Sequence, residues 1–289
     1  MIEGSARSPV RALSEQPTSD HPAPVSGMSN LTKRVLSAVV LGPLVLLCVW
    51  MGEIWFAGLI AVVVVAGGGE WRKMARLDKL GVGTLLVLGP LFIVVAIFSA
   101  GVTAGLFGLL LGLIMALGSF GSTWSERRWA VVALLHLVCA ALALFFLRQT
   151  PEIGRDLVFI LFGAVWLSDI GGYVAGSLFG GAKLAPRISP NKTWAGFVGA
   201  IGFTVVGALV LSHLTEAGGA GNLILAAALS LATQAGDLFE SWIKRLFEVK
   251  DSGNLIPGHG GVLDRVDGLL LAAPVLALFV LISGSDLVL

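Results

Sequence analysis

Acidic and basic side chains gather between residues 237 and 267, in a chain whose other segments are strongly apolar. Side chains at three- and four-residue steps share one face of a helix, and a polar face on an apolar helix points into a cavity. The residues with this spacing are Asp237, Glu240, Ser241, Lys244 and Glu248. Asp264 and Asp267 stand three apart at the start of the last apolar segment, so both can face the same point. Because Mg²⁺ commonly takes one or two carboxylates together with substrate phosphates, the stretch indicates metal-assisted chemistry on a phosphate-bearing ligand.

Cations and a glycine-rich turn accompany these carboxylates. Guanidinium and ammonium groups neutralise phosphates, and four of them occur here: Lys244, Arg245, Lys250 and Arg265. His259 stands at the tip of a Pro-Gly-His-Gly-Gly turn, where it gains little from packing. A phosphate contact and a structural role are equally open for it. Helix capping would explain Asp264 alone, but not the whole cluster.

A second polar block covers residues 169–193. Asp169 lies inside an apolar run, where an ionised carboxylate costs about 2.5–3.5 kcal/mol and needs a cation, a metal ion or a water-filled cavity. A salt bridge to a neighbouring helix is the structural alternative. The same helix face carries Gly171, Gly172 and Gly176. Because glycine has no side chain, this face permits close packing or approach by a ligand.

The end of this block, Ser-Pro-Asn-Lys-Thr, leads directly into a new apolar segment. A cation and hydroxyl groups at a helix N-terminus form a natural anion site, so Ser189, Lys192 and Thr193 are predicted to bind substrate. Lys183 and Arg187 belong to the same loop. They either bind substrate as well or anchor the loop to lipid headgroups.

The composition shows what kind of elements must position these residues. Of the 289 residues, 56% are hydrophobic and only 13% are charged. Soluble domains carry about 25% charged residues, so this is an integral membrane protein. The net charge of +1 gives no support for nucleic-acid binding. Cys48 and Cys139 both lie in apolar runs and are read as packing residues.

Apolar segments long enough, or nearly long enough, to cross a bilayer recur along the chain. The nine segments cover residues 35–51, 54–69, 81–99, 102–118, 129–147, 157–178, 195–213, 222–242 and 266–285. The expected fold class is an all-α polytopic membrane protein with about nine transmembrane helices. Residues 1–30 are predicted to be a disordered tail, residues 31–155 to form the N-terminal transmembrane helices and residues 156–289 the C-terminal transmembrane catalytic region.

The basic residues predict the orientation of these segments. With the N-terminus in the cytoplasm, every Lys and Arg except Arg148 and Arg155 falls on the cytoplasmic side, as the positive-inside rule requires. The C-terminus then lies outside, and both polar blocks face the cytoplasm. Because the chain has the compact build of a single enzyme, we expect its bilayer to be a bacterial inner membrane.

A resemblance to a known family now adds to this interpretation. The stretch SWIKRLFEVKDSGNLIPGHGGVLDRVD closely resembles the signature of the phosphatidate cytidylyltransferases, or CDP-diacylglycerol synthases. The segments SDIGGYVAGSLFG and KLAPRISPNKTWAG resemble the second characteristic block of that family, in the same order. The resemblance covers about residues 165–268. It implies that CTP and phosphatidic acid condense to CDP-diacylglycerol and pyrophosphate, a step of phospholipid biosynthesis.

The resemblance also implies roles for individual residues. The catalytic set is Asp237, Asp264, Lys244, Lys250 and Arg265. The metal set is Asp237, Asp264 and Asp267, to which the intramembrane position of Asp169 adds a fourth carboxylate. The resemblance implies phosphate contacts for Lys192, Arg245 and His259, and the loop residues Lys183, Arg187, Ser189 and Thr193 described above complete the substrate-binding set. The implied cofactor is Mg²⁺, with a second metal ion such as K⁺ or another divalent ion as an option, and the implied partners are CTP, phosphatidic acid, the lipid bilayer and a second copy in a homodimer.

Two other functions compete with this one. A CTP-dependent polyprenol or phytol kinase would move the γ-phosphoryl group, but the long block of cations, His-Gly-Gly and paired Asp argues against it. An ion-coupled transporter would also place carboxylates in the membrane. Transporters often show internally repeated halves, whereas neither polar block has a second copy here.

Overall fold

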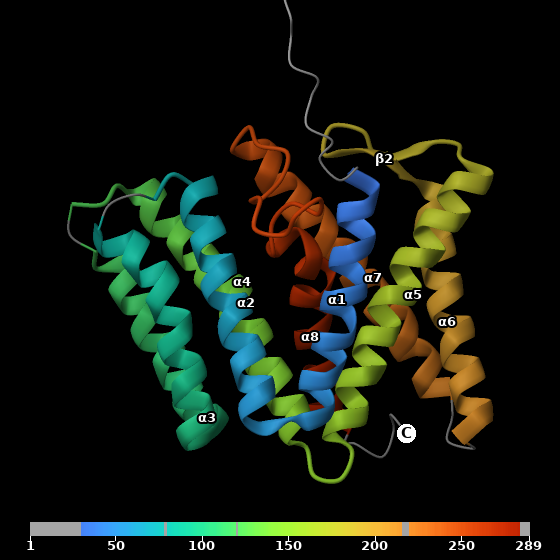
Figure 1. Cartoon of the computed structure of the whole chain (residues 1–289), viewed down its shortest axis with the longest axis horizontal. Helices are drawn as coiled ribbons and strands as arrows, with labels where there is room; N and C mark the ends of the chain where they lie inside the picture. The colour runs from blue at the N-terminus through green and yellow to red at the C-terminus, as the bar shows by residue number, and fades with distance from the viewer. Residues whose placement is uncertain (1–29, 78–79, 120, 216–219, 284–289) are drawn as a thin grey trace, which may run out of the picture.

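The computed structural model describes residues 30–77, 80–119, 121–215 and 220–283, so the predicted tail of residues 1–30 lies almost wholly outside this part. Helices make up most of it (Figure 1). They are α1 (Asn30–Met51), α2 (Glu53–Met74), α3 (Leu80–Leu117), α4 (Trp124–Gln149), α5 (Gly154–Phe179), α6 (Trp194–Thr215), α7 (Ala220–Leu246) and α8 (Leu263–Ser283). Seven of these helices are long and apolar enough to cross a membrane, and a shorter apolar stretch covers Val35–Met51. The chain is therefore an all-α polytopic membrane protein apart from one small hairpin.

Each of the nine predicted segments falls on a helix, although residue 118 follows the end of α3 and residues 284 and 285 lie outside the described part of the chain; two of the segments share α3. These two segments, residues 81–99 and 102–118, meet at Gly101, whose φ of 84° and ψ of 177° are not helical. The two halves of α3 lie against each other, because a Cβ on Gly105 would collide with Ile97 and one on Gly108 would lie 3.0 Å from Ile93. A glycine can reverse the chain here since it tolerates a positive φ.

Helix α4 is the central element of the apolar core. It packs against α2, α3, α5 and α8, and 72% of its most apolar 18-residue stretch is buried. Its His136 is 7% exposed and makes edge-to-face contacts with Trp71 and Phe239. The N-terminus of α4 is fixed by a capping box between Thr123 and Glu126, which ends the preceding loop.

Helices α5 and α6 approach each other closely through glycines, as the sequence predicted for Gly171 and Gly172. A Cβ on Gly171 would lie 2.7 Å from the carbonyl oxygen of Gly199, and one on Gly196 would lie 2.8 Å from that of Gly172. Small residues allow such contact where lipid provides no hydrophobic driving force for helix association. The close contact fixes the wall that carries Asp169 relative to the loop that carries Lys192.

Polar segments collect at one end of the molecule. The strands β1 (Lys183–Ala185) and β2 (Ser189–Thr193) form an antiparallel hairpin between α5 and α6, which is the exception to the predicted all-α class. The hairpin, the α7–α8 loop and the start of α1 lie at the same end (Figure 1). The Ser37 hydroxyl of α1 donates to the carbonyl of Pro257 at 3.0 Å, which ties α1 to the α7–α8 loop.

Candidate functional site

Two polar cavities open near this end and share part of their walls. The first, of about 450 Å³, lies between α5, α6, α7 and β2, and its polar lining includes Ser168, Asp169, Tyr173, Ser177, Asn191, Lys192, Thr193, Gln234 and Asp237. The second, of about 460 Å³, is lined by Asp169, Asp237, Lys244, Asp251, Asp264, Arg265 and Asp267. Asp169 and Asp237 line both cavities. The two polar blocks of the sequence are thus brought together around one charged space.

An ion pair joins the two blocks. The Lys192 ammonium lies 2.6 Å from Oδ2 of Asp237, and both side chains are only partly exposed. The Ser241 hydroxyl, one turn further along α7, donates to Oδ1 of Asp237 at 3.3 Å. Thr193 is 5% exposed, and its Oγ1 accepts from the Gly196 amide at 3.1 Å, so its side chain caps the N-terminus of α6. Lys192 therefore stands directly before a capped helix N-terminus, as predicted.

A second, more buried ion pair lies near the C-terminal end of α7. The Lys244 ammonium lies 2.6 Å from Oδ1 of Asp264 and 3.1 Å from Oε1 of Glu240. The other oxygen of Asp264, Oδ2, accepts from the Ser252 amide at 3.0 Å, the Ser252 hydroxyl at 2.9 Å and the Gly261 amide at 2.8 Å. Asp264 thus fixes the loop between α7 and α8 onto Lys244. Its Oδ1 keeps one lone pair beyond the bond from Lys244.

The polar stripe predicted for α7 is shorter than expected. Asp237, Glu240, Ser241 and Lys244 lie within the helix, which ends at Leu246. Glu248 lies beyond that end with a φ of 58° and is exposed, so its inclusion in the stripe was wrong. The chain reverses there because the amide of Val249 donates back to the carbonyl of Lys244 at 2.9 Å.

Glu70 is a functional candidate that the sequence analysis missed. It lies on α2, beyond the predicted end of that segment at residue 69, and is 3% exposed. Its Oε1 accepts from the Val262 amide at 2.8 Å, while Oε2 accepts from the Leu263 amide at 2.9 Å and the Ser252 hydroxyl at 3.0 Å. A buried carboxylate thus caps the N-terminus of α8, where the helix dipole favours negative charge. Through Ser252 it is linked to Asp264.

The carboxylates of the second cavity provide donors for a hard metal ion. Asp267 uses Oδ1 to accept from the Gly268 amide at 2.7 Å, and Asp169 has no hydrogen bond or ion pair among the residues described. Within the described part of the chain, no three Asp, Glu, His or Cys side chains are placed so that they alone could hold a metal ion. The donor set still fits Mg²⁺, which commonly takes one or two carboxylates and completes its shell with water and substrate phosphates. Asp251, which the sequence analysis left out, lines this cavity as well.

Several predicted substrate contacts, and Lys250 of the predicted catalytic set, lie outside both cavities. Lys183, Arg187 and Ser189 belong to the hairpin, and Lys250 is exposed on the α7–α8 loop. Arg245 donates to the carbonyls of Ile188 and Val249, both at 3.3 Å, so it links the hairpin to the end of α7. His259 lies in the turn closed by the Ile256–Gly260 bridge, where its amide donates to the carbonyl of Ile256 at 2.9 Å. These residues border the site, while the walls hold Asp169, Lys192, Thr193, Asp237, Lys244, Asp264, Arg265 and Asp267.

The fold and the site define a class of protein: an integral membrane protein with a charged cavity suited to a phosphate-bearing ligand. The chain belongs to the cytidylyltransferase family, whose sequence model matches residues 32–283. A phosphatidate cytidylyltransferase of Brucella suis is 40% identical over 256 residues, which cover 87% of this chain and 94% of that protein. Proteins of the same name from Pseudomonas aeruginosa and Haemophilus influenzae are 34% and 33% identical, over 88% and 86% of this chain and 98% of each relative.

Proposed function

We propose that this chain transfers the cytidylyl group of CTP to phosphatidate, giving CDP-diacylglycerol and pyrophosphate. The observation that carries the proposal is the pair of polar cavities that share Asp169 and Asp237. One holds a lysine at a helix N-terminus and the other holds a cluster of carboxylates with two cations. Both lie in the part of the chain that matches the cytidylyltransferase family.

The reaction asks little of the protein in proton transfer. An oxygen of the phosphatidate phosphate attacks the α-phosphorus of CTP, a new P–O bond forms, and the bond between the α-phosphorus and the bridging oxygen breaks. Pyrophosphate leaves with that oxygen. Since the attacking oxygen is already anionic, no strong base is needed. The barrier is the repulsion between two polyanions, so positioning and countercharge carry the catalysis.

The side chains of the site match these needs. Lys192 and Arg265 would neutralise phosphate oxygens, and Lys244 would hold Asp264 in place while offering charge to the same space. One or two of the carboxylates of Asp237, Asp267, Asp169 and Asp264 would hold Mg²⁺ together with substrate phosphates and water. When bound, this ion would neutralise the triphosphate and favour departure of pyrophosphate. Lys192 can exchange its partner Asp237 for a phosphate once the carboxylate engages a cation, because both partners are accessible from the cavity.

The hairpin residues Lys183, Arg187 and Ser189 would contact the substrate only from the rim. The same holds for Arg245, Lys250 and His259, at the end of α7 and on the α7–α8 loop. Rim cations chiefly raise the local concentration of anionic substrate and do little to the chemical step. Their substitution should therefore affect KM for CTP more than kcat.

We also propose nine membrane crossings, with the site facing the cytoplasm of a bacterial inner membrane. The two halves of α3 lie against each other, which supports two crossings within that helix. The start of α1 and both polar loops lie at one end, and α8 ends at the opposite end (Figure 1). An odd number of crossings requires the start of α1 and the end of α8 to lie on opposite sides of the membrane. The positive-inside rule assigns the polar end to the cytoplasm.

The test uses purified protein in mixed micelles with phosphatidate, Mg²⁺ and CTP labelled at either the α- or the γ-phosphate. Lipid that carries the α-label, with labelled pyrophosphate from the γ-labelled CTP, is the expected result. With a panel of lipid acceptors, γ-label in the lipid would instead make this chain a kinase. Label in neither would contradict group transfer and favour the transporter alternative.

A further inference from the structure

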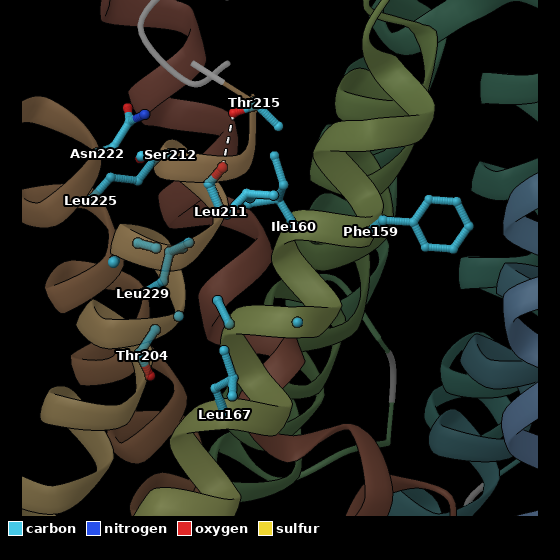
Figure 2. Close-up of a pocket in the computed structure, with 15 residues that line it drawn as sticks. Phe159, Ile160, Leu167, Thr204, Leu211, Ser212, Thr215, Asn222, Leu225 and Leu229 are labelled. Atoms are coloured by element: carbon cyan, nitrogen blue, oxygen red, sulfur yellow. Dashed lines mark hydrogen bonds between the residues drawn. The ribbon is translucent and has the colours of Figure 1, made fainter. Parts of the chain in front are cut away.

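An apolar cavity of about 350 Å³ lies between α5, α6 and α7 (Figure 2), and none of the described residues that line it is charged. Leu167, Leu211, Leu225 and Leu229 supply much of its wall. The polar residues of the wall are Thr204, Ser212, Thr215 and Asn222. The hydroxyls of Thr204 and Thr215 each donate to a carbonyl of their own helix, at 2.9 and 3.0 Å. The cavity therefore offers mainly carbon to an occupant.

This apolar cavity lies next to the polar cavity that holds Lys192 and Asp237. Both lie between the same three helices, and their linings follow each other along the chain. On α5 the apolar lining ends at Leu167 and the polar lining begins at Ser168. On α6, Ala200 of the polar cavity and Thr204 of the apolar one are one turn apart. The three helices thus border a cavity with charged side chains toward the hairpin and an apolar cavity toward their far ends.

We propose that the apolar cavity binds an acyl chain of phosphatidate whose phosphate lies in the adjoining polar cavity. The inference rests on the proposed function, since that reaction requires a lipid with its phosphate beside Lys192. The chains of such a lipid start a few bonds from the phosphate and cannot remain in a charged space. The two neighbouring cavities provide both environments that such a lipid needs. Cation and hydroxyl groups lie in the polar cavity, and the apolar cavity beside it is lined mainly by carbon. A detergent or bulk lipid would meet the apolar part alone and leave the polar part unexplained.

The cavity should orient the substrate and add little to its affinity. Lipid tails are as apolar as leucine side chains, so moving a chain from the bilayer into the cavity gains little hydrophobic free energy. A seated chain instead restricts how the phosphate can lie relative to the α-phosphorus of CTP, and such positioning acts on the rate. The effect should appear in kcat/KM for phosphatidates whose chains are long enough to reach the cavity.

Gly163 allows the cavity to be filled without disturbing the helices. It lines the cavity, and a Cβ at this position would meet no atom within 4 Å. It is six residues before Asp169, so it lies about 9 Å down α5 from the charged site. The variant Gly163→Leu adds an apolar side chain where the acyl chain would lie. Gly202→Leu is the matched control, because Gly202 is an exposed position of α6 outside the cavity with the same open space around its Cβ.

The experiment presents dihexanoyl and dioleoyl phosphatidate together in one micelle and measures the ratio of the two CDP-diacylglycerol products by mass spectrometry. The ratio does not depend on how much of each variant is active. Gly163→Leu should reduce dioleoyl product relative to dihexanoyl product on the order of tenfold, the size of effect that one apolar group has in a substrate pocket. Gly202→Leu should leave the ratio of the unsubstituted protein unchanged.

Three other results would overturn the inference, and they differ from one another. An unchanged ratio in Gly163→Leu means that no reacting acyl chain occupies the cavity. An equal shift in Gly202→Leu means that the chain-length effect is a general property of the membrane surface. No nucleotide-linked lipid from either substrate with the unsubstituted protein overturns the proposed function, and the inference with it.

Discussion

The hydrogen bonds of Glu70 predict a large and specific effect of its replacement. Glu70 accepts from the Val262 amide, the Leu263 amide and the Ser252 hydroxyl, at 2.8 to 3.0 Å. Hydrogen bonds to a charged group contribute about 1.5–3 kcal/mol each, so Glu70→Ala should cost on the order of 5 kcal/mol in stability. Glu70→Gln keeps one acceptor oxygen, which can serve two of the three donors. It should therefore lose only one bond, about 1.5–3 kcal/mol.

The activity of the two variants should separate a positioning role from simple stability. The Ser252 hydroxyl has one hydrogen and lies within 3.0 Å of both Glu70 and Asp264, so it can donate to only one of them at a time. In Glu70→Gln the side-chain amide opposes a backbone donor, which should shift the loop that holds Asp264. We expect kcat to fall while KM for CTP stays nearly constant, because the cations of the cavity remain.

The assay pairs thermal unfolding in detergent with the transfer of α-label from CTP to lipid. Melting curves of the unsubstituted protein, Glu70→Gln and Glu70→Ala should show decreasing stability in that order. At a temperature where Glu70→Gln stays folded, its kcat should still be reduced. A Glu70→Gln protein with unchanged stability and kcat would contradict this prediction, since it would show that the carboxylate charge at the start of α8 is not needed.

Two further predictions concern the buried ion pair and the α5–α6 contact. Lys244→Met leaves the buried carboxylates of Glu240 and Asp264 without their cation and should cost about 3–5 kcal/mol. Adding Glu240→Gln should recover part of the melting temperature but no label transfer, and recovery of both would show that Lys244 acts only in folding. Gly199→Ala should destabilise the fold by about 1–3 kcal/mol through overpacking, because its Cβ would collide with Ala175. Gly202→Ala on the same helix should be neutral, and equal melting temperatures for the two variants would contradict the close contact.

The sequence predicted the charged centre well because its signals are local. Asp169 stands inside an apolar run and Lys192 stands at the start of a helix. Each can be recognised as unusual from the residues beside it. Helical spacing on α7 also correctly placed Asp237 and Lys244 on one face, toward the cavity. The family and its reaction followed from the same stretches, and the match over residues 32–283 confirms the family.

The parts that could not be predicted depend on contacts between distant segments. Glu70 stands beside Arg72 and Lys73 and looks like an ordinary polar flank of α2. Its partners lie 182 to 193 residues further along the chain, so no local pattern points to them. For Arg245 the residue type fits phosphate, but its place near the end of α7 turns it toward backbone carbonyls of the hairpin and the loop.

The end of a helix likewise depends on local backbone geometry that spacing does not reveal. Helical steps continue from Lys244 to Glu248, although the chain leaves the helix after Leu246. Gly101 shows the opposite case, since two segments read as separate helices meet at a single residue with a positive φ. In both places the apolar pattern was right and the backbone conformation was set by one or two residues.

The most direct test of this account is the transfer of α-label from CTP into phosphatidate by an Asp237→Asn variant. Asp237 lines both polar cavities and pairs with Lys192 at 2.6 Å, and asparagine keeps its shape while removing its charge. The account predicts a loss of transfer on the order of 100-fold or more, with a melting temperature close to that of the unsubstituted protein. Near-normal transfer by the folded variant would contradict the claim that these cavities are the site of cytidylyl transfer.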